Sequence, residues 1–294
     1  MQARNLLQRL DEIGGSLSES HRKIASFLVE SGHNAAFMTA ADIAASVKVS
    51  ESTVVRFARI LDFKGFPELQ EFLRAGLLKS LSPADRLDMH RDIADEKQLA
   101  EHVAEMEVAN IRAAFGQVDV RAMRTLAESI CRARHCYVVG LRSSRSPATL
   151  LSHYLMKIVP QVRAITTSDL IFEELNWIND QDVLVAFSFP RYSKPTINAV
   201  RIAKKAGACT ATITDSRTSP AALLSDHCLV SPVNSGFFGN SFAAAIAMSN
   251  LLLSFCTRVQ PEAVHRNLDR IESAASKEQR FIDLSIRQDI DDAD

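Results

Sequence analysis

The sequence predicts an α/β chain in two parts, an all-helical N-terminal domain followed by a doubly wound α/β domain with a five-stranded parallel sheet. From Leu6 to about Ser80, apolar residues recur at the three- and four-residue spacing of amphipathic helices. After residue 134, short β-type runs alternate with helical stretches, which is the pattern of parallel α/β folds. A polar stretch containing Pro83 separates the two patterns. We therefore place the helical domain at residues 1–80.

Residues 81–133 are predicted to form a linker and bridging helices. The polar stretch from Ser80 to Lys97 breaks the hydrophobic rhythm. A first bridging helix follows, and we expect one face of it to carry Leu99, Val103, Met106, Asn110 and Ala113. Asp119 is placed to cap a second helix, in which the apolar positions are Met123, Leu126 and Ile130.

Five runs in residues 134–260 are predicted to be the strands. Apolar residues are nearly continuous within several of them, as expected for strands that are covered on both faces. A long helix from about Phe242 to Val259 should close this domain, and residues 261–294 should form a helical tail. The strands are predicted at CYVVGL (136–141), VRAITT (162–167), VLVAFSF (183–189), CTATIT (209–214) and HCLVSP (227–232).

Composition excludes several classes of protein. The longest nearly apolar stretch, Phe242 to Met248, is far shorter than the ~20 residues that cross a bilayer. The charged start MQARNLLQRL has no apolar segment of a secretory signal, so we expect a cytoplasmic protein. No metal or cofactor site is expected, because the cysteines form no CxxC pair and read as reduced core thiols. They are Cys131, Cys136, Cys209, Cys228 and Cys256.

Residues 40–59, AADIAASVKVSESTVVRFAR, have the pattern of a helix-turn-helix. Five apolar positions lock the two helices together, a small residue (Ala44) lies where they cross, and Ser50 is a suitable N-cap for the second helix. Lys48 stands where glycine commonly makes the turn, at a cost of roughly 1 kcal/mol for a left-handed residue. The five apolar positions are Ile43, Val47, Val49, Val54 and Phe57.

The N-terminal part of the second helix enters the major groove in this docking mode. The net charge of the chain is only −1, so local charge matters, and residues 48–64 carry a modest excess of two positive charges. The alternative for each residue is an ordinary solvated side chain. We predict base or phosphate contacts by Ser50, Ser52, Thr53 and Arg56, and further DNA contacts by Lys48, Arg59 and Lys64.

The segment from Leu17 to Leu73 resembles the N-terminal domain of RpiR/MurR-type regulators, including the runs TVVRF and FKGFPEL. The resemblance extends over most of the chain. It implies a domain that binds a double-stranded DNA operator, joined to a SIS (sugar isomerase) domain. It also implies a homodimer or homotetramer.

Polar loops follow the first and third predicted strands. If the strand order is 2-1-3-4-5, both loops lie at the topological switch point, where ligands of such sheets bind. Each loop, 142–147 and 190–195, leads into a helix, so backbone N–H groups converge on an anion. Together with the resemblance to SIS domains, this implies a small anionic sugar phosphate as the ligand. Its phosphate would be bound by hydroxyls of Ser143, Ser144, Ser188 and Ser193.

Two arginines replace glycines of the SIS loop patterns. SIS domains typically show G-x-G-x-S after the first strand and S-x-S-G-x-T after the third. Here GLRSS puts Arg142 at a glycine position, and SFPRYS puts Arg191 at another. Guanidinium groups facing one crevice favour an additional carboxylate or phosphate, so we expect a phosphorylated sugar acid. The alternative is that Arg142, Arg145 and Arg191 point to solvent or pair with acids across a dimer interface.

A sugar-phosphate isomerase is the rival hypothesis, because SIS domains also host aldose–ketose chemistry. Its base would have to be Glu173, Glu174, His153 or His227, none of which lies in a recognisable motif. We therefore expect a sensor with no catalytic residue. A third loop, 234–241, either covers the crevice or serves only as a turn.

Overall fold

The structure is a computed structural model that describes residues 10, 17–31, 35, 38–70, 72–73, 83–88 and 95–278. The chain forms two compact units. One comprises Met1–Ala104 with Ser235–Asn240, and the other comprises Glu105–Asn234 with Ser241–Asp294.

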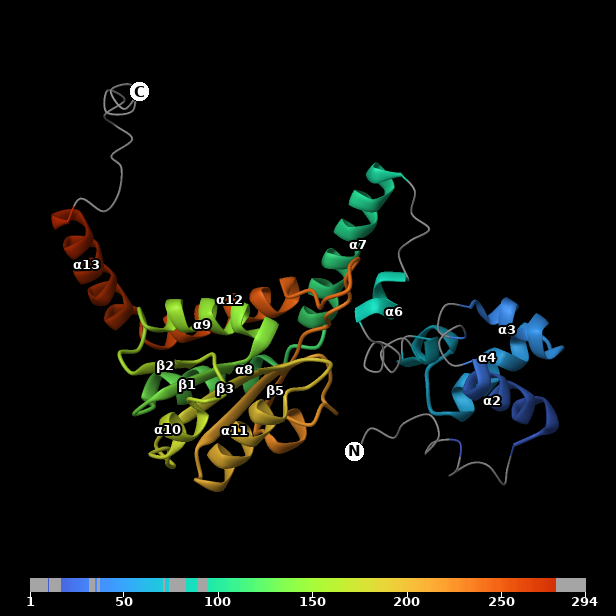
Figure 1. Cartoon of the computed structure of the whole chain (residues 1–294), viewed down its shortest axis with the longest axis horizontal. Helices are drawn as coiled ribbons and strands as arrows, with labels where there is room; N and C mark the ends of the chain where they lie inside the picture. The colour runs from blue at the N-terminus through green and yellow to red at the C-terminus, as the bar shows by residue number, and fades with distance from the viewer. Residues whose placement is uncertain are drawn as a thin grey trace. The chain divides into compact units, whose positions relative to one another are not determined.

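The helical unit contains α2 (Glu19–Ser31), α3 (Ala40–Val47), α4 (Glu51–Ile60) and α6 (Pro83–Asp88), as Figure 1 shows. Its core confirms the helical periodicity of the sequence, because residues spaced by three or four positions point inward. Val47 and Val49, which the motif places among the locking residues, are only partly buried at its edge. Fully buried side chains include Ile24, Ile43, Val54, Phe57 and Leu69.

Helix α7 (Glu96–Phe115) belongs to both units, and α8 (Val120–Arg132) follows it. Asp119 caps α8 as predicted, since its carboxylate accepts the N–H groups of Arg121 and Ala122. The expected face of α7 is partly wrong. Leu99 is exposed, and Ala114 rather than Ala113 is fully buried, because the buried positions Asn110 and Ala114 are four residues apart.

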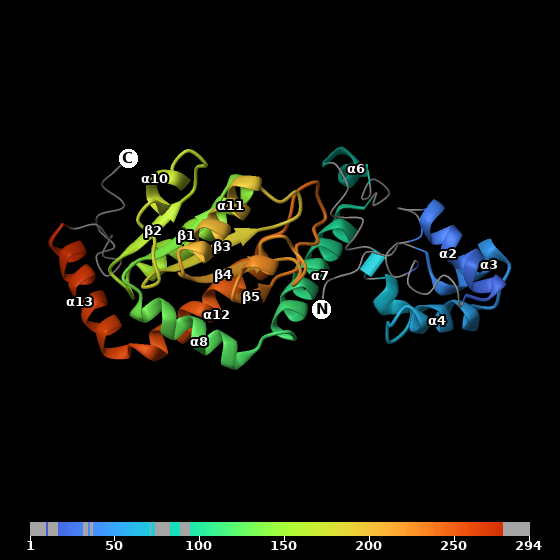
Figure 2. The same ribbon diagram turned by 90° about the horizontal axis from the view of Figure 1, so that it is seen from below.

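The sheet has the predicted order, β2-β1-β3-β4-β5, and all its pairs are parallel (Figure 2). Four of the five strands end one or two residues earlier than predicted. They end where the chain leaves the ladder to enter the loops that follow, which a run of apolar letters does not mark. The strands are β1 (Cys136–Gly140), β2 (Val162–Ile165), β3 (Val183–Ser188), β4 (Cys209–Thr214) and β5 (His227–Val230).

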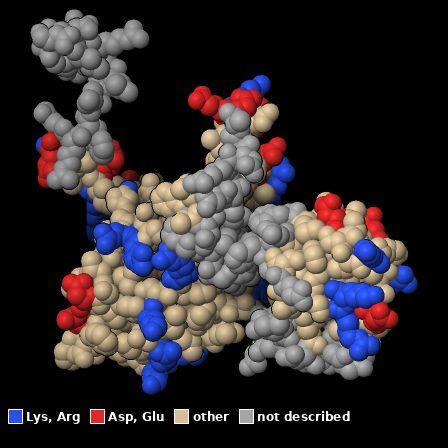
Figure 3. All heavy atoms as spheres, turned by 45° about the vertical axis from the view of Figure 1, so that its right-hand side comes forward, with Lys and Arg blue, Asp and Glu red and all other residues tan. Residues whose placement is uncertain are grey.

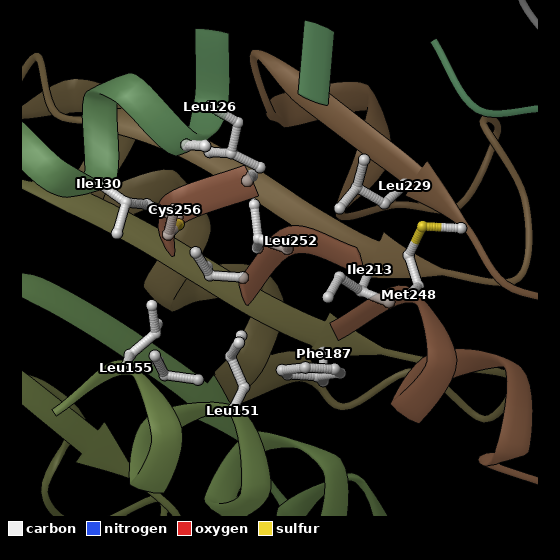
Figure 4. Packing of buried hydrophobic residues seen from close by; sticks show 14 of the residues in the cluster. Leu126, Ile130, Leu151, Leu155, Phe187, Ile213, Leu229, Met248, Leu252 and Cys256 are labelled. Carbon is white, nitrogen blue, oxygen red and sulfur yellow. The ribbon is translucent and has the colours of Figure 1, made fainter. Parts of the chain in front are cut away.

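Helices cover both faces of this sheet, as in doubly wound folds. One face packs against α8, α9 (Arg145–Leu155) and α12 (Ala243–Val259), whose buried side chains meet those of the strands in Figure 4. The other face is covered by α10 (Ile171–Leu175) and α11 (Lys194–Lys205). Helix α13 (Pro261–Lys277) follows α12. The core that Figure 4 shows includes Leu126, Leu151, Phe187, Ile213, Leu229 and Leu252.

The five cysteines are free thiols; Cys131, Cys136 and Cys256 are buried, and the other two are half-buried. Burial raises the pKa of Cys136 to about 12, so this thiol stays protonated. Within the described ranges, no helix combines the length and apolarity needed to span a bilayer.

Candidate functional site

The turn between α3 and α4 has the geometry that its sequence predicts. Lys48 is in the left-handed region, with φ 56° and ψ 51°, and ends α3 in the place of the usual glycine. Ser50 is the N-cap of α4, and its hydroxyl accepts the N–H of Thr53 at 3.3 Å. At the other end of α3, Thr39 and Asp42 form a capping box. The second helix therefore starts at a defined angle after a three-residue turn.

The beginning of α4 is exposed to solvent. Ser52, Arg56 and Arg59 lie at helical spacings of four and three residues, so they share one exposed stripe, opposite the buried Val54 and Phe57. The Nε of Arg56 donates to the carbonyl oxygen of Ser52 at 3.3 Å.

The other predicted DNA contacts differ in exposure. Lys48, Ser50 and Lys64 are exposed, whereas Thr53 is half-buried. The Ser50 hydroxyl is already engaged with Ser52 and Thr53. Figure 3 shows Lys and Arg side chains gathered on the visible face of the helical unit.

In the α/β unit, the loops after β1 and β3 are neighbours, because Gly140 at the end of β1 pairs with Phe187 of β3. Gly140 allows the 3₁₀ turn η3 (Arg142–Ser144) and α9 to lie directly on β1. A Cβ at this position would meet the carbonyl oxygen of Ser144 and the Cβ of Ala148, both at 2.4 Å. Only glycine fits there.

The two arginines in the glycine positions of these loops adopt the backbone conformation that favours glycine. Arg142 has φ 56° and Arg191 has φ 68°. Each conformation costs roughly 1–2 kcal/mol for a residue with a Cβ, and such strain concentrates at ligand sites. Both side chains are exposed, and among the described residues neither guanidinium has an ion-pair partner. The loops thus present two positive charges from neighbouring strand ends, without an ion pair inside the described part of the chain.

The serine hydroxyls at the loops after β1 and β3, where we predict the ligand crevice, are not used in helix capping. Ser144 and Ser193 are the N-caps of α9 and α11, yet neither side chain makes a cap hydrogen bond. Ser188, at the end of β3, is 2% exposed, and its buried Oγ has no hydrogen-bond partner in the described part of the chain. Ser143 is exposed. Two helix N-termini and unused hydroxyls form the surroundings that an oxyanion requires.

Tyr192 anchors the loop after β3, and the sequence analysis missed it. Its hydroxyl donates to Oδ1 of Asp215, beyond the end of β4, at 2.8 Å. Burial, together with the Asp215 carboxylate, raises the pKa of Tyr192, so the phenol remains a neutral donor. The bond fixes the backbone on either side of Arg191. In the sequence, the local signal for this role was a tyrosine directly after the glycine position of the loop.

The residues considered for isomerase chemistry are scattered. His227 begins β5 and His153 lies in the last turn of α9, so both are near the amino edge of the sheet, opposite the crevice. Glu174 is paired with Arg163 at 3.0 Å, and Glu173 is exposed in α10. Burial lowers the pKa of His227. The structure does not assemble these groups into one site.

Two hollows of the α/β unit lie elsewhere. One, of about 110 Å³, is beside β5 and includes Asp119 and Arg217. The other, of about 510 Å³, is at the amino edge of the sheet and includes Arg134 and Asp182. Neither contains a residue of the two crevice loops. We favour the loops after β1 and β3, because the buried Oγ of Ser188 has no partner among the described residues, whereas Arg134 and Asp182 bond each other.

Comparison with known proteins identifies both domains. Residues 4–80 match the helix-turn-helix domain of the rpiR family, and residues 129–255 match the SIS domain. An uncharacterized HTH-type transcriptional regulator of Haemophilus influenzae is 27% identical over 290 residues, covering 97% of this chain and 98% of the relative. The HTH-type transcriptional regulator RpiR of Escherichia coli is 24% identical over 246 residues, with 83% and 82% covered.

Solved structures agree with this assignment. The sugar isomerase domain of an RpiR transcription factor from Sphaerobacter thermophilus has a TM-score of 0.58 and 29% identity, and covers 60% of this chain and 99% of that domain. The NanR protein of Vibrio vulnificus, complexed with ManNAc-6P, shares the fold with a TM-score of 0.58 and 21% identity, and covers 93% of this chain and 98% of its own. The chain is a transcriptional regulator of the RpiR family, with an N-terminal helix-turn-helix domain and a C-terminal SIS domain.

Proposed function

We propose that this regulator binds a double-stranded DNA operator through α4 and that a phosphorylated sugar or sugar acid, bound in the SIS crevice, controls its affinity for that operator. The observation that carries the effector half of the proposal is the buried Oγ of Ser188, at the end of β3 before the loop that leads into α11, which has no hydrogen-bond partner among the described residues. A buried hydroxyl without a partner is rare in native proteins and calls for an explanation. A bound oxyanion provides one.

The DNA-binding half rests on the exposed stripe of α4. We assign Ser52 and Arg56, at the start of α4, to base or phosphate contacts, and Arg59 and Lys64 to the flanking DNA backbone; all four are exposed. Lys48, Ser50 and Thr53 complete the proposed surface. Because the Ser50 hydroxyl caps α4, we assign Ser50 mainly to the orientation of this helix.

The ligand should carry a second anionic group beside its phosphate. The two helix N-termini with Ser143, Ser144, Ser188 and Ser193 supply one phosphate site. Arg142 and Arg191 add two charges that this phosphate does not need, and guanidinium groups bind carboxylates in a bidentate manner. A phosphorylated sugar acid satisfies both. That NanR, a protein of the same fold, is complexed with ManNAc-6P supports the sugar-phosphate class.

Control of DNA affinity follows from linkage. An effector changes operator affinity only to the extent that it binds the two conformations of the regulator differently. We propose a homodimer or homotetramer, acting in the cytoplasm, whose paired helix-turn-helix domains read two similar half-sites. We also propose that the crevice binds its ligand without chemistry, because the acid–base candidates do not converge there.

A titration of operator binding tests the proposal. Fluorescently labelled DNA from upstream of the gene is bound by the full-length protein, and 6-phosphogluconate, glucose 6-phosphate and N-acetylmannosamine 6-phosphate are added in turn. We expect at least one compound to change the apparent Kd for DNA by about tenfold. Ser188→Ala should bind DNA normally but lose the response.

The control is Ser254→Ala, which removes an exposed serine of α12. This variant should keep the full response. An unchanged response in Ser188→Ala would show that the crevice is not the effector site. Isomerase turnover by a protein that does not retain DNA would refute the regulatory proposal altogether.

A further inference from the structure

We infer that Thr167, after β2, is a further effector-binding residue whose hydroxyl contacts the part of the ligand remote from the phosphate. The inference rests on the proposed function of the SIS crevice. It starts from one observation: the Oγ1 of Thr167 is buried and has no hydrogen-bond partner among the residues that the structure describes. Hydroxyls in this state are uncommon unless a ligand or ordered water completes them.

Three buried hydroxyls without a described partner lie just at, or beyond, carboxyl ends of strands: Thr167 after β2, Ser188 in β3 and Ser231 after β5. Because side chains alternate between the two faces of a sheet, the position of each hydroxyl relative to a core residue of its strand indicates which face it belongs to. Thr167 is two residues beyond Ile165, and Ser188 two beyond Ala186; both reference residues belong to the core beneath α10 and α11.

Ser231 falls into the opposite group. It is two residues beyond Leu229, which packs on the other face of the sheet with α8, α9 and α12. By this count Ser188 faces the side of α10 and α11, and Ser231 faces the other side. Thr167 lies in the bend that follows β2, and its place on the face of Ser188 is part of the inference.

The strand order gives an approximate separation between Thr167 and Ser188. β1 lies between β2 and β3, and neighbouring strands are about 4.8 Å apart. Thr167 and Ser188 thus flank the loop of Arg142 at a separation of about 10 Å, or two strand spacings. A phosphorylated five- or six-carbon chain can reach both, whereas inorganic phosphate bound at Ser188 cannot.

The chemistry at Thr167 suits a neutral group of the ligand. The helix that follows, α10, has only five residues, so it offers little of the helix-terminus charge that α9 and α11 supply. Asp169, two residues on, is exposed and adds a negative charge. A sugar hydroxyl, which both donates and accepts, matches the threonine hydroxyl better than a second phosphate does.

The test compares Thr167→Val, which keeps the shape and removes the hydroxyl, with Thr167→Ser, which keeps the hydroxyl. Calorimetry on the full-length protein measures the Kd for 6-phosphogluconate, glucose 6-phosphate, N-acetylmannosamine 6-phosphate and inorganic phosphate. For the tightest sugar derivative, we expect Thr167→Val to weaken binding about five- to tenfold, the loss of one neutral hydrogen bond. The Kd for inorganic phosphate should not change, and Thr167→Ser should stay within about twofold of wild type.

Thr166→Val, at the half-buried neighbouring threonine, is the matched control and should leave every Kd unchanged. Thermal unfolding of each variant verifies that it folds. Tight binding by the wild type with an unchanged Kd in Thr167→Val would overturn this inference alone. Equal weakening for phosphate and sugar derivative would also overturn it, because the effect would then be on the phosphate site or on the fold. If the wild type binds none of the probes, the proposed function fails, and this inference fails with it.

Discussion

The side-chain amide of Asn110, in α7, donates a hydrogen bond of 2.7 Å to the carbonyl oxygen of Asn234, beyond β5. Asn110 is 1% exposed, so this bond is made inside the α/β unit. A second bond joins the same two segments, from the hydroxyl of Ser241 to the carboxylate of Glu107. Both ends of the loop 234–241 are thus tied to α7, the helix that is shared between the two units of the chain.

Replacing Asn110 with alanine should lower the free energy of unfolding of the α/β unit by about 0.5–1.5 kcal/mol, because the hydrogen bond from its buried side chain to the carbonyl oxygen of Asn234 is lost. Urea denaturation measures the change. Asn250→Ala, at an exposed position of α12, is the control and should change stability by less than about 0.5 kcal/mol. An equal decrease in the free energy of unfolding of both variants would show that the hydrogen bond of Asn110 does not stabilise the unit.

Arg142→Gly and Arg191→Gly should stabilise the fold slightly while weakening the binding of acidic ligands. Glycine relieves about 1–2 kcal/mol of strain in the left-handed backbone. It also destabilises the fold by about 0.4–1 kcal/mol, because it gives the unfolded chain more conformational entropy. The expected net gain is between about 0 and 1.6 kcal/mol per site. Arg145→Gly is the matched control, because Arg145 has an ordinary φ of −56° and should lose stability. A loss of stability in all three variants would show that the backbone at Arg142 and Arg191 is not strained.

Arg56→Ala should weaken operator binding and reduce the slope of log Kobs against log salt by about 1, if Arg56 contacts one phosphate. A base contact would instead relax sequence preference and cost about 1–3 kcal/mol. Binding measured at several salt concentrations, on operator and on scrambled DNA, separates the two roles. Arg270→Ala, exposed on α13, should change neither quantity. If Arg56→Ala binds both DNAs as wild type does, α4 does not read DNA through this residue.

Asp182 should make stability depend on pH in the acid range. Burial raises the pKa of its carboxyl, but the hydrogen bonds from Arg134 and from the backbone of Asn179 outweigh this and leave the pKa below its ordinary 3.8. The unfolded state therefore binds the proton more readily, and the stabilising contribution is present above pH ~4 and lost as the pH falls through the lowered pKa.

The measurement is the free energy of unfolding of wild type and Asp182→Asn between pH 3 and pH 7. Wild-type stability should rise from pH 3 to pH 5 more steeply than that of the variant, and the variant should be about 1–3 kcal/mol less stable at pH 7. Asp180→Asn, two residues earlier and exposed, should follow the wild-type curve. Parallel curves for wild type and Asp182→Asn would show that the Asp182 pKa is not lowered in the folded state.

The sequence was sufficient for the turn at Lys48, which depends on a local pattern. The strand order 2-1-3-4-5 was assumed from the rules of doubly wound folds, and the sheet has that order. The sequence was insufficient for Thr167, which the run VRAITT assigned to a strand, since alternation does not tell where a strand ends. The bond between Tyr192 and Asp215 joins residues 23 positions apart, and no periodicity encodes such a pair. The ligand-binding and DNA-binding roles of individual residues remain predictions.

The tight approach at Gly140 has a consequence for how relatives of this chain can diverge. With backbone and Cβ atoms at 2.4 Å from any added methyl group, that position admits no alternative amino acid. The side chains at positions 142 and 191 are exposed and are not part of the core, so they can vary among residues that tolerate the left-handed backbone. Under the proposed function, paralogues would acquire new metabolite preferences by changing these two loop residues, while the sheet beneath them is inherited intact.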